Sequence, residues 1–294
     1  MTAIDSLGFI GLGTMGEPMC ANLARKAGLK VHAMDRRREP LDRLAAAGVV
    51  TCASIAELAA RAELIFLSLP SGRQVEEVCL GPGGIATAGG RTRIVVDCGT
   101  SPVALTRTLA SRLAEAGIEF ADAPVARTRE AAQQARLSIM VGASAALFAR
   151  ISPFLAAMGT DITHCGPVGC GQVVKILNNM VLFETVGALA EALAIGGRAG
   201  VDERLLLETL SKGSADSFAL RNHAMKAMLP RQFPENAFCA EYAMKDLGYA
   251  LELARAGGIE AAGAELVRER LGAVIAGGHG RKYWPVLLAA VEGE

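Results

Sequence analysis

The stretch Leu7–Gly16 (LGFIGLGTMG) decides the fold class of this chain. Its first four residues form a short apolar run that predicts a strand, and the next six form a G-x-G-x-x-G turn. A helical pattern follows over Pro18–Ala27. In this order, the first glycine permits a tight turn, the second lets the backbone approach a pyrophosphate, and the third lets the helix pack on the strand. The helix N-terminus then faces the anion, so the stretch predicts a dinucleotide-binding unit.

The next predicted strand, Lys30–Met34, leads into Asp35, nineteen residues after Gly16. A carboxylate at this point accepts hydrogen bonds from ribose hydroxyls and repels a 2′-phosphate, which favours NAD. Three arginines follow at once, at 36–38, and they either grip a 2′-phosphate or form a solvated basic turn. We therefore expect NAD as the cofactor, with NADP not excluded.

Strand and helix patterns alternate through the first half of the chain. Further strands are expected at 49–52, 64–69, 93–97, 118–121, 137–142 and 163–165, and helices at 41–47, 55–61, 74–79, 103–115, 129–134 and 144–158. Pro153 is expected to split the last of these helices into two short pieces. The alternation predicts an α/β domain, a Rossmann-like doubly wound parallel sheet.

Polar loops follow the carboxyl ends of these strands, where cofactors and substrates bind in such sheets. Leu69-Pro70 follows one strand, and Thr100-Ser101 follows the next. Either Thr100 or Ser101 is expected to face the nicotinamide, with helix capping the favoured role of Ser101. Arg127 and Thr128 follow a third strand, where a guanidinium beside a hydroxyl suits a carboxylate, sulfonate or phosphate. The alternative for Arg127 is a surface salt bridge.

The pattern changes near Gly166, and almost no strand signal remains after it. The stretch Gly169–Met180 (GCGQVVKILNNM) opens a long helix, and further helices are expected at 203–213, 217–227, 238–257 and 260–276, with a tail at 284–291. We expect a dinucleotide-binding domain over 1–165 and an all-helical substrate and dimerisation domain over 166–294. Gln172, Lys175 and Asn179 make a polar stripe on an otherwise apolar helix. Either this stripe belongs to a site, or Lys175 reaches solvent and the asparagines bridge neighbouring helices.

Composition narrows the class of function. The 294 residues include 30 basic and 30 acidic side chains, and this balance argues against nucleic acid or a membrane surface as the main partner. The seven cysteines are scattered and the four histidines do not cluster, so no metal site is expected. With no signal peptide and no uninterrupted membrane span in the pattern, we expect a soluble cytoplasmic protein.

Several motifs together resemble the β-hydroxyacid dehydrogenases, a family that contains 3-hydroxyisobutyrate dehydrogenase. They are GFIGLGTMGEPM at the start, LP at 69–70, DAPV at 122–125, GCGQVVKILNN at 169–179 and MKDL at 244–247. The resemblance implies that Lys175 is the catalytic acid/base, that Asn179 orients the substrate with Asn178 close by, and that Lys245 lies near substrate and nicotinamide. It implies these cofactor-binding residues: Gly11, Leu12, Gly13, Thr14, Met15, Gly16, Asp35, Arg36, Leu69, Pro70, Thr100 and Lys245. It also implies a homodimer or homotetramer formed through the helical domain.

One departure from the family pattern concerns the substrate. The usual continuation of DAPV is S-G-G, but here Ala126-Arg127-Thr128 follows, a turn similar to that of the sulfolactaldehyde reductases. The hypothesis is therefore NAD(H)-dependent interconversion of a small anionic 3-hydroxy acid, or a sulfonate analogue, with its aldehyde. Lys175 acts near neutral pH only if its pKa is lowered, for which Arg127 and Lys245 are expected to supply positive charge. The alternatives are an imine reductase-like enzyme on the same fold and a non-catalytic dinucleotide-binding sensor.

Overall fold

A computed structural model describes residues 4–235 and 237–293. The chain folds into two compact units that divide between Lys175 and Ile176, inside helix α8 (Cys170–Arg198). The sequence places its domain boundary ten residues earlier, between residues 165 and 166.

The first unit is built on a nine-stranded sheet with the order β3-β2-β1-β4-β5-β6-β8-β7, and β9 pairs with β8. Its strands are β1 (Ser6–Ile10), β2 (Lys30–Met34), β3 (Val50–Thr51), β4 (Leu64–Leu67), β5 (Ile94–Asp97), β6 (Glu119–Asp122), β7 (Val125–Ala126), β8 (Leu137–Gly142) and β9 (Gly159–Gly166). The six strands from β3 to β6 are parallel. Their order is that of dinucleotide-binding sheets, in which the order of strand addition reverses between β1 and β4 and leaves a crevice at the carboxyl ends of these parallel strands. The expected fold class is confirmed.

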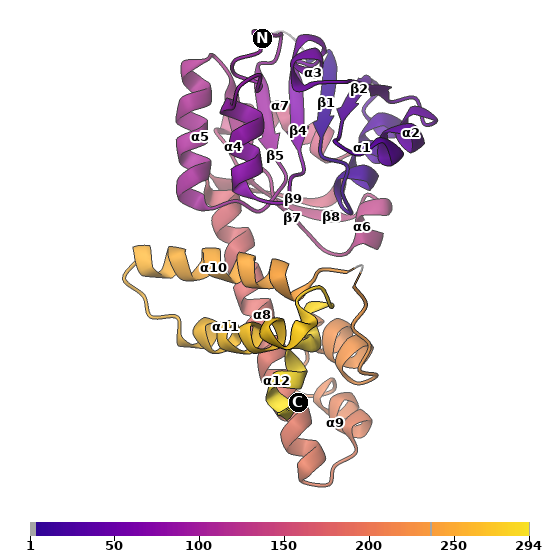
Figure 1. The fold of residues 1–294 in the computed structure, drawn as a ribbon, viewed down its shortest axis with the longest axis vertical. Helices are drawn as coiled ribbons and strands as arrows, with labels where there is room; N and C mark the ends of the chain where they lie inside the picture. Colours follow the sequence, from indigo (N-terminus) through magenta and orange to yellow (C-terminus); the bar gives the residue numbers. More distant parts are fainter. Residues whose placement is uncertain (1–3, 236, 294) are drawn as a thin grey trace. The chain divides into compact units, whose positions relative to one another are not determined.

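Helices cover both faces of this sheet (Figure 1). They are α1 (Gly16–Lys26), α2 (Arg38–Ala45), α3 (Ile55–Arg61), α4 (Gly72–Leu80), α5 (Val103–Glu115), α6 (Arg129–Gln133) and α7 (Ala145–Leu155). Because strand side chains alternate between faces, Phe66 packs with α1 and α7 while its neighbours Ile65 and Leu67 pack with α3, α4 and α5. Each strand buried on both sides therefore reads as a continuous apolar run.

The structure departs from the expectations at the β6 edge. Strand β8 runs antiparallel to β6 and to the two-residue strand β7, which the sequence does not reveal, and β9 is longer than expected. The sheet is thus mixed at this edge and parallel elsewhere. Pro153 lies within a continuous α7 rather than splitting it. It stands in the last turn, two residues before the helix ends, so the one backbone hydrogen bond that its missing N–H removes lies at the end of the helix and does not divide it.

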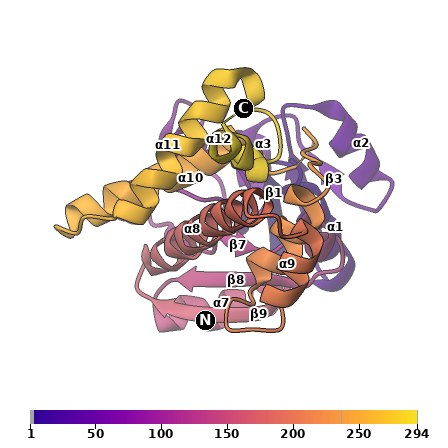
Figure 2. The ribbon, with the colours of Figure 1, turned by 90° about the horizontal axis from the view of Figure 1, so that it is seen from below.

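The second unit is helical, as expected. After α8 its elements are α9 (Glu203–Leu210), the π-helix η1 (Leu220–Met228), α10 (Ala240–Ala256), α11 (Ala262–Val274), the π-helix η2 (Ile275–His279), the 3₁₀-helix η3 (Trp284–Leu287) and α12 (Leu288–Glu292). Helices α10 and α11 lie side by side as a hairpin (Figures 1 and 2). Trp284 packs edge-on against Phe183 of α8, with ring centroids 4.8 Å apart, and both belong to the buried core of this unit.

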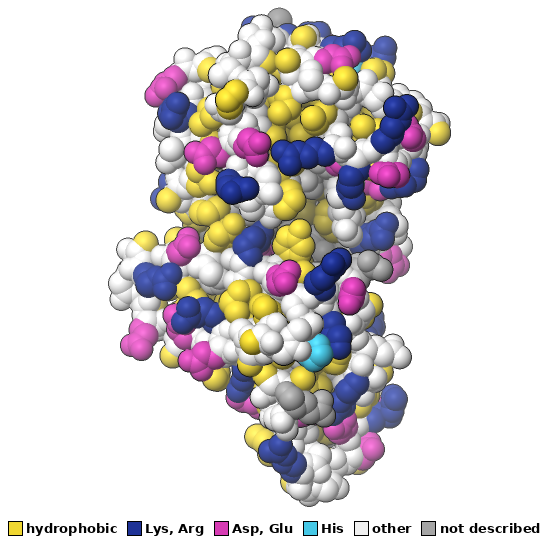
Figure 3. Space-filling view, in the orientation of Figure 1, with side chains coloured by type: hydrophobic (Ala, Val, Ile, Leu, Met, Phe, Trp, Pro, Cys, Tyr) yellow, Lys and Arg dark blue, Asp and Glu magenta, His cyan; other side chains and the backbone are white. Residues whose placement is uncertain are grey.

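Charged side chains of both signs are interspersed over the visible surface (Figure 3), in keeping with the equal numbers of acidic and basic residues. Within the described residues, α8 is the helix that is long and apolar enough to match the size and composition of a membrane span. A core helix of a soluble protein meets the same criterion, so this match is weak evidence for a membrane.

Candidate functional site

The glycine turn has the geometry of a ligand cradle. A Cβ added to Gly11, which has φ +93°, would collide with the Ser68 carbonyl oxygen, and one at Gly16 would collide with the carbonyl of Gly11. A Cβ at Gly13, in contrast, would meet no described protein atom within 4 Å. No described side chain caps the start of α1, whose N-cap residue is Met15. The first and third glycines are thus needed for close packing, while the second borders open space, the pattern that a dinucleotide-binding turn requires.

Asp35 lies at the end of β2, beside this turn. Its carboxylate accepts hydrogen bonds from the backbone N–H groups of Leu12 and Arg37. Burial raises the pKa of Asp35, but these hydrogen bonds and the Arg37 guanidinium together hold it below its ordinary value. Arg37 also donates from its guanidinium to the Leu12 carbonyl at 2.8 Å, whereas the side chain of Arg36 is 80% exposed and pairs with Glu77 at 3.5 Å. Arg37, which the sequence did not single out, is therefore the arginine that lies against Asp35.

Two more loops begin at the same edge of the sheet. Leu67 of β4 is the register partner of both Ile10 of β1 and Asp97 of β5, so the chain leaves all three strands at one level. The loops that follow carry Leu69-Pro70 and Thr100, and the Leu69 side chain lies against the Gly11 position. The structure therefore brings together the expected cofactor residues of the glycine turn, Asp35, Leu69, Pro70 and Thr100.

The start of α8 is held at this edge by a buried carboxylate. Asp122, at the end of β6, accepts hydrogen bonds from the backbone N–H of Gly169 at 2.6 Å and of Gln172 at 2.8 Å. Burial raises the pKa of Asp122 to about 6, and the two hydrogen bonds limit the rise. Lys175 follows Gln172 by three residues, so it lies one turn further along the helix.

The loop after β5 is held by side chains from two directions. Ser101 does not cap α5, contrary to expectation: the N-cap residue is Pro102, and the Ser101 hydroxyl donates to Asp97 at 2.8 Å. Gln172 completes the support, because its amide bonds the backbone of Gly99 and of Ser101.

A polar cluster in the helical unit contains three more of the expected site residues, Asn178, Asn179 and Lys245. Asn179 donates from Nδ2 to Oδ2 of Asp246 at 2.8 Å, and Asn178 donates to Oδ1 of Asn179 at 3.2 Å. Lys245 places its Nζ 3.2 Å from Oδ1 of Asp246. The same Nζ lies 5.6 and 5.4 Å from the ring centroids of Tyr242 and Tyr249, a cation–π arrangement. The structure thus brings Asn178, Asn179 and Lys245 together through Asp246, which is 2% exposed.

Arg127 and Thr128 both have structural partners. Arg127 has φ +87°, which is uncommon for a residue with a side chain. Its guanidinium pairs with Asp161 at 2.8 Å and donates to the Arg136 carbonyl at 2.6 Å. The Thr128 hydroxyl caps α6 by accepting from the Ala131 N–H at 3.3 Å. The surface salt bridge considered from sequence is therefore present.

Two buried aspartates, one in each unit, hold expected site residues in place but have no role in the sequence-based expectations. Asp122 and Asp246 belong to the quoted motifs DAPV and MKDL, but neither was given a role. The available signal was an acidic residue at the end of an apolar strand or on an apolar helix face, since a buried carboxylate requires hydrogen-bond partners. In the described part of the chain, no group of three or more His, Cys, Asp or Glu side chains could hold a metal ion.

Comparison with known proteins gives matches along nearly the whole chain. A family described as the NAD binding domain of 6-phosphogluconate dehydrogenase matches residues 6–166, and one described as NAD-binding of NADP-dependent 3-hydroxyisobutyrate dehydrogenase matches residues 169–283. The 2-(hydroxymethyl)glutarate dehydrogenase of Eubacterium barkeri is 38% identical over 253 residues, which are 86% of this chain and 83% of the relative. The 3-hydroxyisobutyrate dehydrogenase of Pseudomonas aeruginosa is 35% identical over 258 residues, 86% of each chain.

Solved structures agree with these matches. A 3-hydroxyisobutyrate dehydrogenase of Mycobacterium tuberculosis, solved with L-serine, is 28% identical with a TM-score of 0.88, covering 98% of this chain and 99% of that one. An imine reductase of Myxococcus stipitatus covers 98% of both chains with a TM-score of 0.66 but is only 18% identical, which shows a shared fold alone.

Proposed function

The chain belongs to the β-hydroxyacid dehydrogenases, a family of NAD(P)-dependent oxidoreductases, and from this premise we propose that it interconverts a small anionic 3-hydroxy acid and its aldehyde. NAD is the proposed cofactor, with NADP not excluded, held by the glycine turn, Asp35 and the loops of Leu69-Pro70 and Thr100. When bound, the nicotinamide would accept or supply the hydride. The 2-(hydroxymethyl)glutarate and 3-hydroxyisobutyrate in the relatives' names are consistent with a short substrate of this class.

One observation carries the proposal: the first turn of α8 is hydrogen-bonded to the edge of the sheet at which the loops proposed to bind the cofactor begin. Gln172 bonds the loop that contains Thr100, and Asp122 bonds the backbone of Gln172. Lys175, one turn later, is therefore anchored to the dinucleotide-binding unit rather than only to the helical one. At this place a lysine can take the proton of the substrate hydroxyl as the neutral amine when the carbinol carbon is oxidised, and return it as the ammonium when the aldehyde is reduced.

We propose that polar side chains on α8 and α10 bind and orient the substrate. Asn179 presents an amide whose orientation is set by Asp246, and Asn178 lies beside it. Lys245 offers an ammonium that the adjacent carboxylate and two tyrosine rings hold in place. An ammonium and amide donors together suit the carboxylate of a hydroxy acid.

Arg127, with Thr128, is proposed as the anchor for a second or larger anion, such as a sulfonate. Its ion pair with Asp161 joins side chains that are 41% and 55% exposed, and exposed pairs are worth about 0–1 kcal/mol. A substrate anion can replace Asp161 at small cost, while the hydrogen bond to the Arg136 carbonyl keeps the guanidinium in place. The strained backbone at Arg127 supports a role for this residue beyond packing.

Two alternatives differ in what they require. An imine reductase-like enzyme would not depend on Lys175, because the imine reductases usually lack this lysine. A non-catalytic dinucleotide sensor would bind cofactor without turnover. The family membership and the organised clusters around Gln172 and Asn179 favour the hydroxy acid dehydrogenase.

The test is reduction of an aldehyde panel with NADH and with NADPH. The panel comprises sulfolactaldehyde and the succinic, methylmalonate and tartronate semialdehydes, assayed with wild type, Lys175→Ala and Arg127→Ala. We expect turnover of at least one aldehyde, loss of most turnover in Lys175→Ala, and a kcat/KM loss in Arg127→Ala that is largest for the most anionic substrate. Near-normal turnover in a folded Lys175→Ala variant would overturn the proposed acid/base, and unchanged kinetics in Arg127→Ala would make Arg127 structural.

We also propose a cytoplasmic homodimer or homotetramer. Large apolar side chains are exposed in the helical unit, including Val181 at 58%, Ile195 at 68% and Phe218 at 57%. A second copy of the chain would cover such side chains. Light scattering on the eluting peak of a size-exclusion column measures the mass directly, and a monomer at micromolar concentration would contradict the proposal.

A further inference from the structure

We propose that Gln172 is a positioning residue for the reaction: its side chain holds the loop that carries Thr100 and the turn that leads to Lys175 in one geometry. The inference rests on the proposed function, since Gln172 would act through Lys175. A side-chain amide neither gains nor loses a proton near neutral pH, so Gln172 is not proposed as an acid or a base.

The amide of Gln172 makes two hydrogen bonds to one loop. Oε1 accepts from the Ser101 N–H at 3.1 Å, and Nε2 donates to the Gly99 carbonyl at 2.9 Å. These backbone groups lie on either side of Thr100. Because the loop offers the amide one donor, the Ser101 N–H, and one acceptor, the Gly99 carbonyl, only one orientation of the amide satisfies both. Gln172 is fully buried, so water cannot replace either bond.

The loop of Thr100 is also held by a side chain of the sheet, Asp97. Asp97, the last residue of β5, accepts from the Gly99 N–H and from the Ser101 hydroxyl, both at 2.8 Å. Asp97 and Gln172 thus bond the same two residues through different atoms. The position of Thr100 therefore depends on both side chains, one from the sheet and one from α8.

The backbone of Gln172 is fixed as well. Asp122 accepts from the N–H groups of Gly169 and Gln172, one on each carboxylate oxygen. Backbone encloses the carboxylate so closely that a Cβ at Gly142 or Gly171 would collide with it. Asp122 is the register partner of Asp97 on the neighbouring strand. The ends of β5 and β6 therefore hold the loop and the helix start as one rigid assembly.

The expected consequence of loosening this assembly is a loss of rate rather than of cofactor affinity. Gln172 lies one turn before Lys175, so a small shift of the first turn of α8 moves the lysine relative to the loop of Thr100. A misplacement of about 1 Å can lower a rate by roughly a hundredfold. Asp35 and the glycine turn are held by other bonds, and Asp97 still bonds the loop of Thr100, so the affinity for the dinucleotide should change little.

The test uses Gln172→Met, which conserves shape and removes both hydrogen bonds, and Gln172→Glu, which keeps the acceptor for Ser101. Tartronate semialdehyde with NADH serves as substrate, or whichever aldehyde of the panel turns over fastest. We expect kcat to fall by about ten- to a hundredfold in Gln172→Met, with the NADH Kd within about threefold of wild type.

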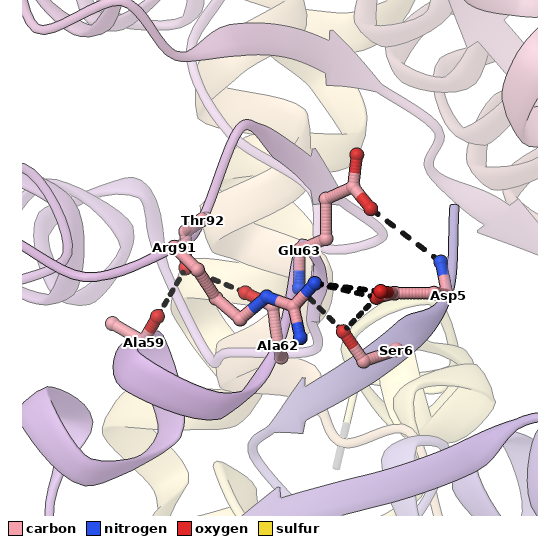
Figure 4. A network of polar contacts seen from close by, with 7 residues as sticks. All are labelled: Asp5, Ser6, Ala59, Ala62, Glu63, Arg91 and Thr92. Atoms are coloured by element: carbon pink, nitrogen blue, oxygen red, sulfur yellow. Dashed lines mark hydrogen bonds and ion pairs between the residues drawn. The ribbon is translucent and has the colours of Figure 1, made fainter. Parts of the chain in front are cut away.

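Thr92→Val is the matched control. Thr92 is 2% exposed, and its hydroxyl donates to the carbonyls of Ala59 and Ala62 at the opposite end of β5 (Figure 4). Its substitution should lower the melting temperature and leave kcat unchanged.

The double variant Gln172→Met/Lys175→Ala separates positioning from stability. If Gln172 acts through Lys175, its substitution should have little further effect once the lysine is gone, because residues that act as a unit are not additive. Equal fold-losses of kcat with and without Lys175 would overturn the proposal, as would wild-type kcat in Gln172→Met or a failure of both Gln172 variants to fold. Full activity of the single variant Lys175→Ala would instead overturn the proposed function, and with it the positioning role proposed for Gln172.

Discussion

The side-chain amide of Asn179 donates a hydrogen bond of 2.8 Å to the carboxylate of Asp246, a residue 67 positions later in the chain. Both side chains are buried, at 6% and 2% exposed. The other oxygen of the carboxylate faces the Lys245 ammonium. One buried aspartate therefore sets the orientation of two groups proposed to contact substrate.

Asp246→Ala should lower kcat/KM strongly although Asp246 itself is not proposed to touch substrate. Removing the anion takes away the acceptor of the Asn179 amide and the carboxylate beside the Lys245 Nζ, and hydrogen bonds to charged groups are worth roughly 1.5–3 kcal/mol. We expect about a ten- to hundredfold loss in steady-state assays. The control is Asp216→Ala, which breaks an exposed ion pair with Arg221 in the same unit and should leave kcat/KM within about twofold. Wild-type kinetics in Asp246→Ala would contradict the role.

Gly13→Ala and Gly16→Ala should fail in different ways. A Cβ at Gly13 meets no described atom, so Gly13→Ala should keep its melting temperature but bind NADH about tenfold or more weakly, because the methyl group would occupy the space of the pyrophosphate. A Cβ at Gly16 would overlap the Gly11 carbonyl, so Gly16→Ala should lose stability. Thermal unfolding and fluorescence titration with NADH distinguish the two. Unchanged NADH affinity in Gly13→Ala would place the pyrophosphate elsewhere.

Cofactor choice should depend on Arg37 more than on Arg36. Arg37 lies against Asp35 and Leu12, where a 2′-phosphate would be met, whereas Arg36 pairs with Glu77 on the surface. We expect Arg37→Ala to lower kcat/KM for NADPH several-fold more than for NADH, and Asp35→Ala to shift preference towards NADPH. Arg36→Ala is the matched control. A larger effect of Arg36→Ala than of Arg37→Ala would reverse this assignment.

Acid should destabilise the protein partly through His223. Its Nδ1 lies 2.6 Å from the Tyr283 hydroxyl, and burial lowers the pKa of His223 to about 4. In the unfolded chain the pKa of this histidine is near 6.5, so between about pH 6.5 and pH 4 the side chain is protonated there but neutral in the native protein. Stability should therefore fall as pH drops from about 6.5 towards 4, by roughly 1 kcal/mol per pH unit from this group.

Urea unfolding at pH 7 and pH 5 measures this effect. His223→Gln cannot titrate, so its free energy of unfolding should fall less over this interval than that of wild type. Tyr283→Phe keeps the buried histidine and should keep the wild-type slope. Identical slopes for His223→Gln and wild type would show that His223 does not contribute.

Much of the fold follows from local pattern. The apolar runs that become β2 and β8 and the helical patterns that become α3 and α5 have the bounds expected from sequence. These elements depend on side-chain period and on turn residues close in the chain. The two-residue β7 and the antiparallel pairing of β8 carry no such signal, because pairing partners are chosen by packing rather than by local preference.

By itself, the sequence determined that a glycine turn follows the first strand, that strands and helices alternate before a helical half, and that Gln172, Lys175 and Asn179 lie along one helix. Each of these depends on residues within a few turns of one another. Only the tertiary structure decided that Asp122 holds the start of α8, that Gln172 brackets Thr100, and that Asp246 orients Asn179. The physical reason is burial: a buried carboxylate or amide must find its partners wherever folding brings them, and no local rule specifies residues that are far apart in the chain.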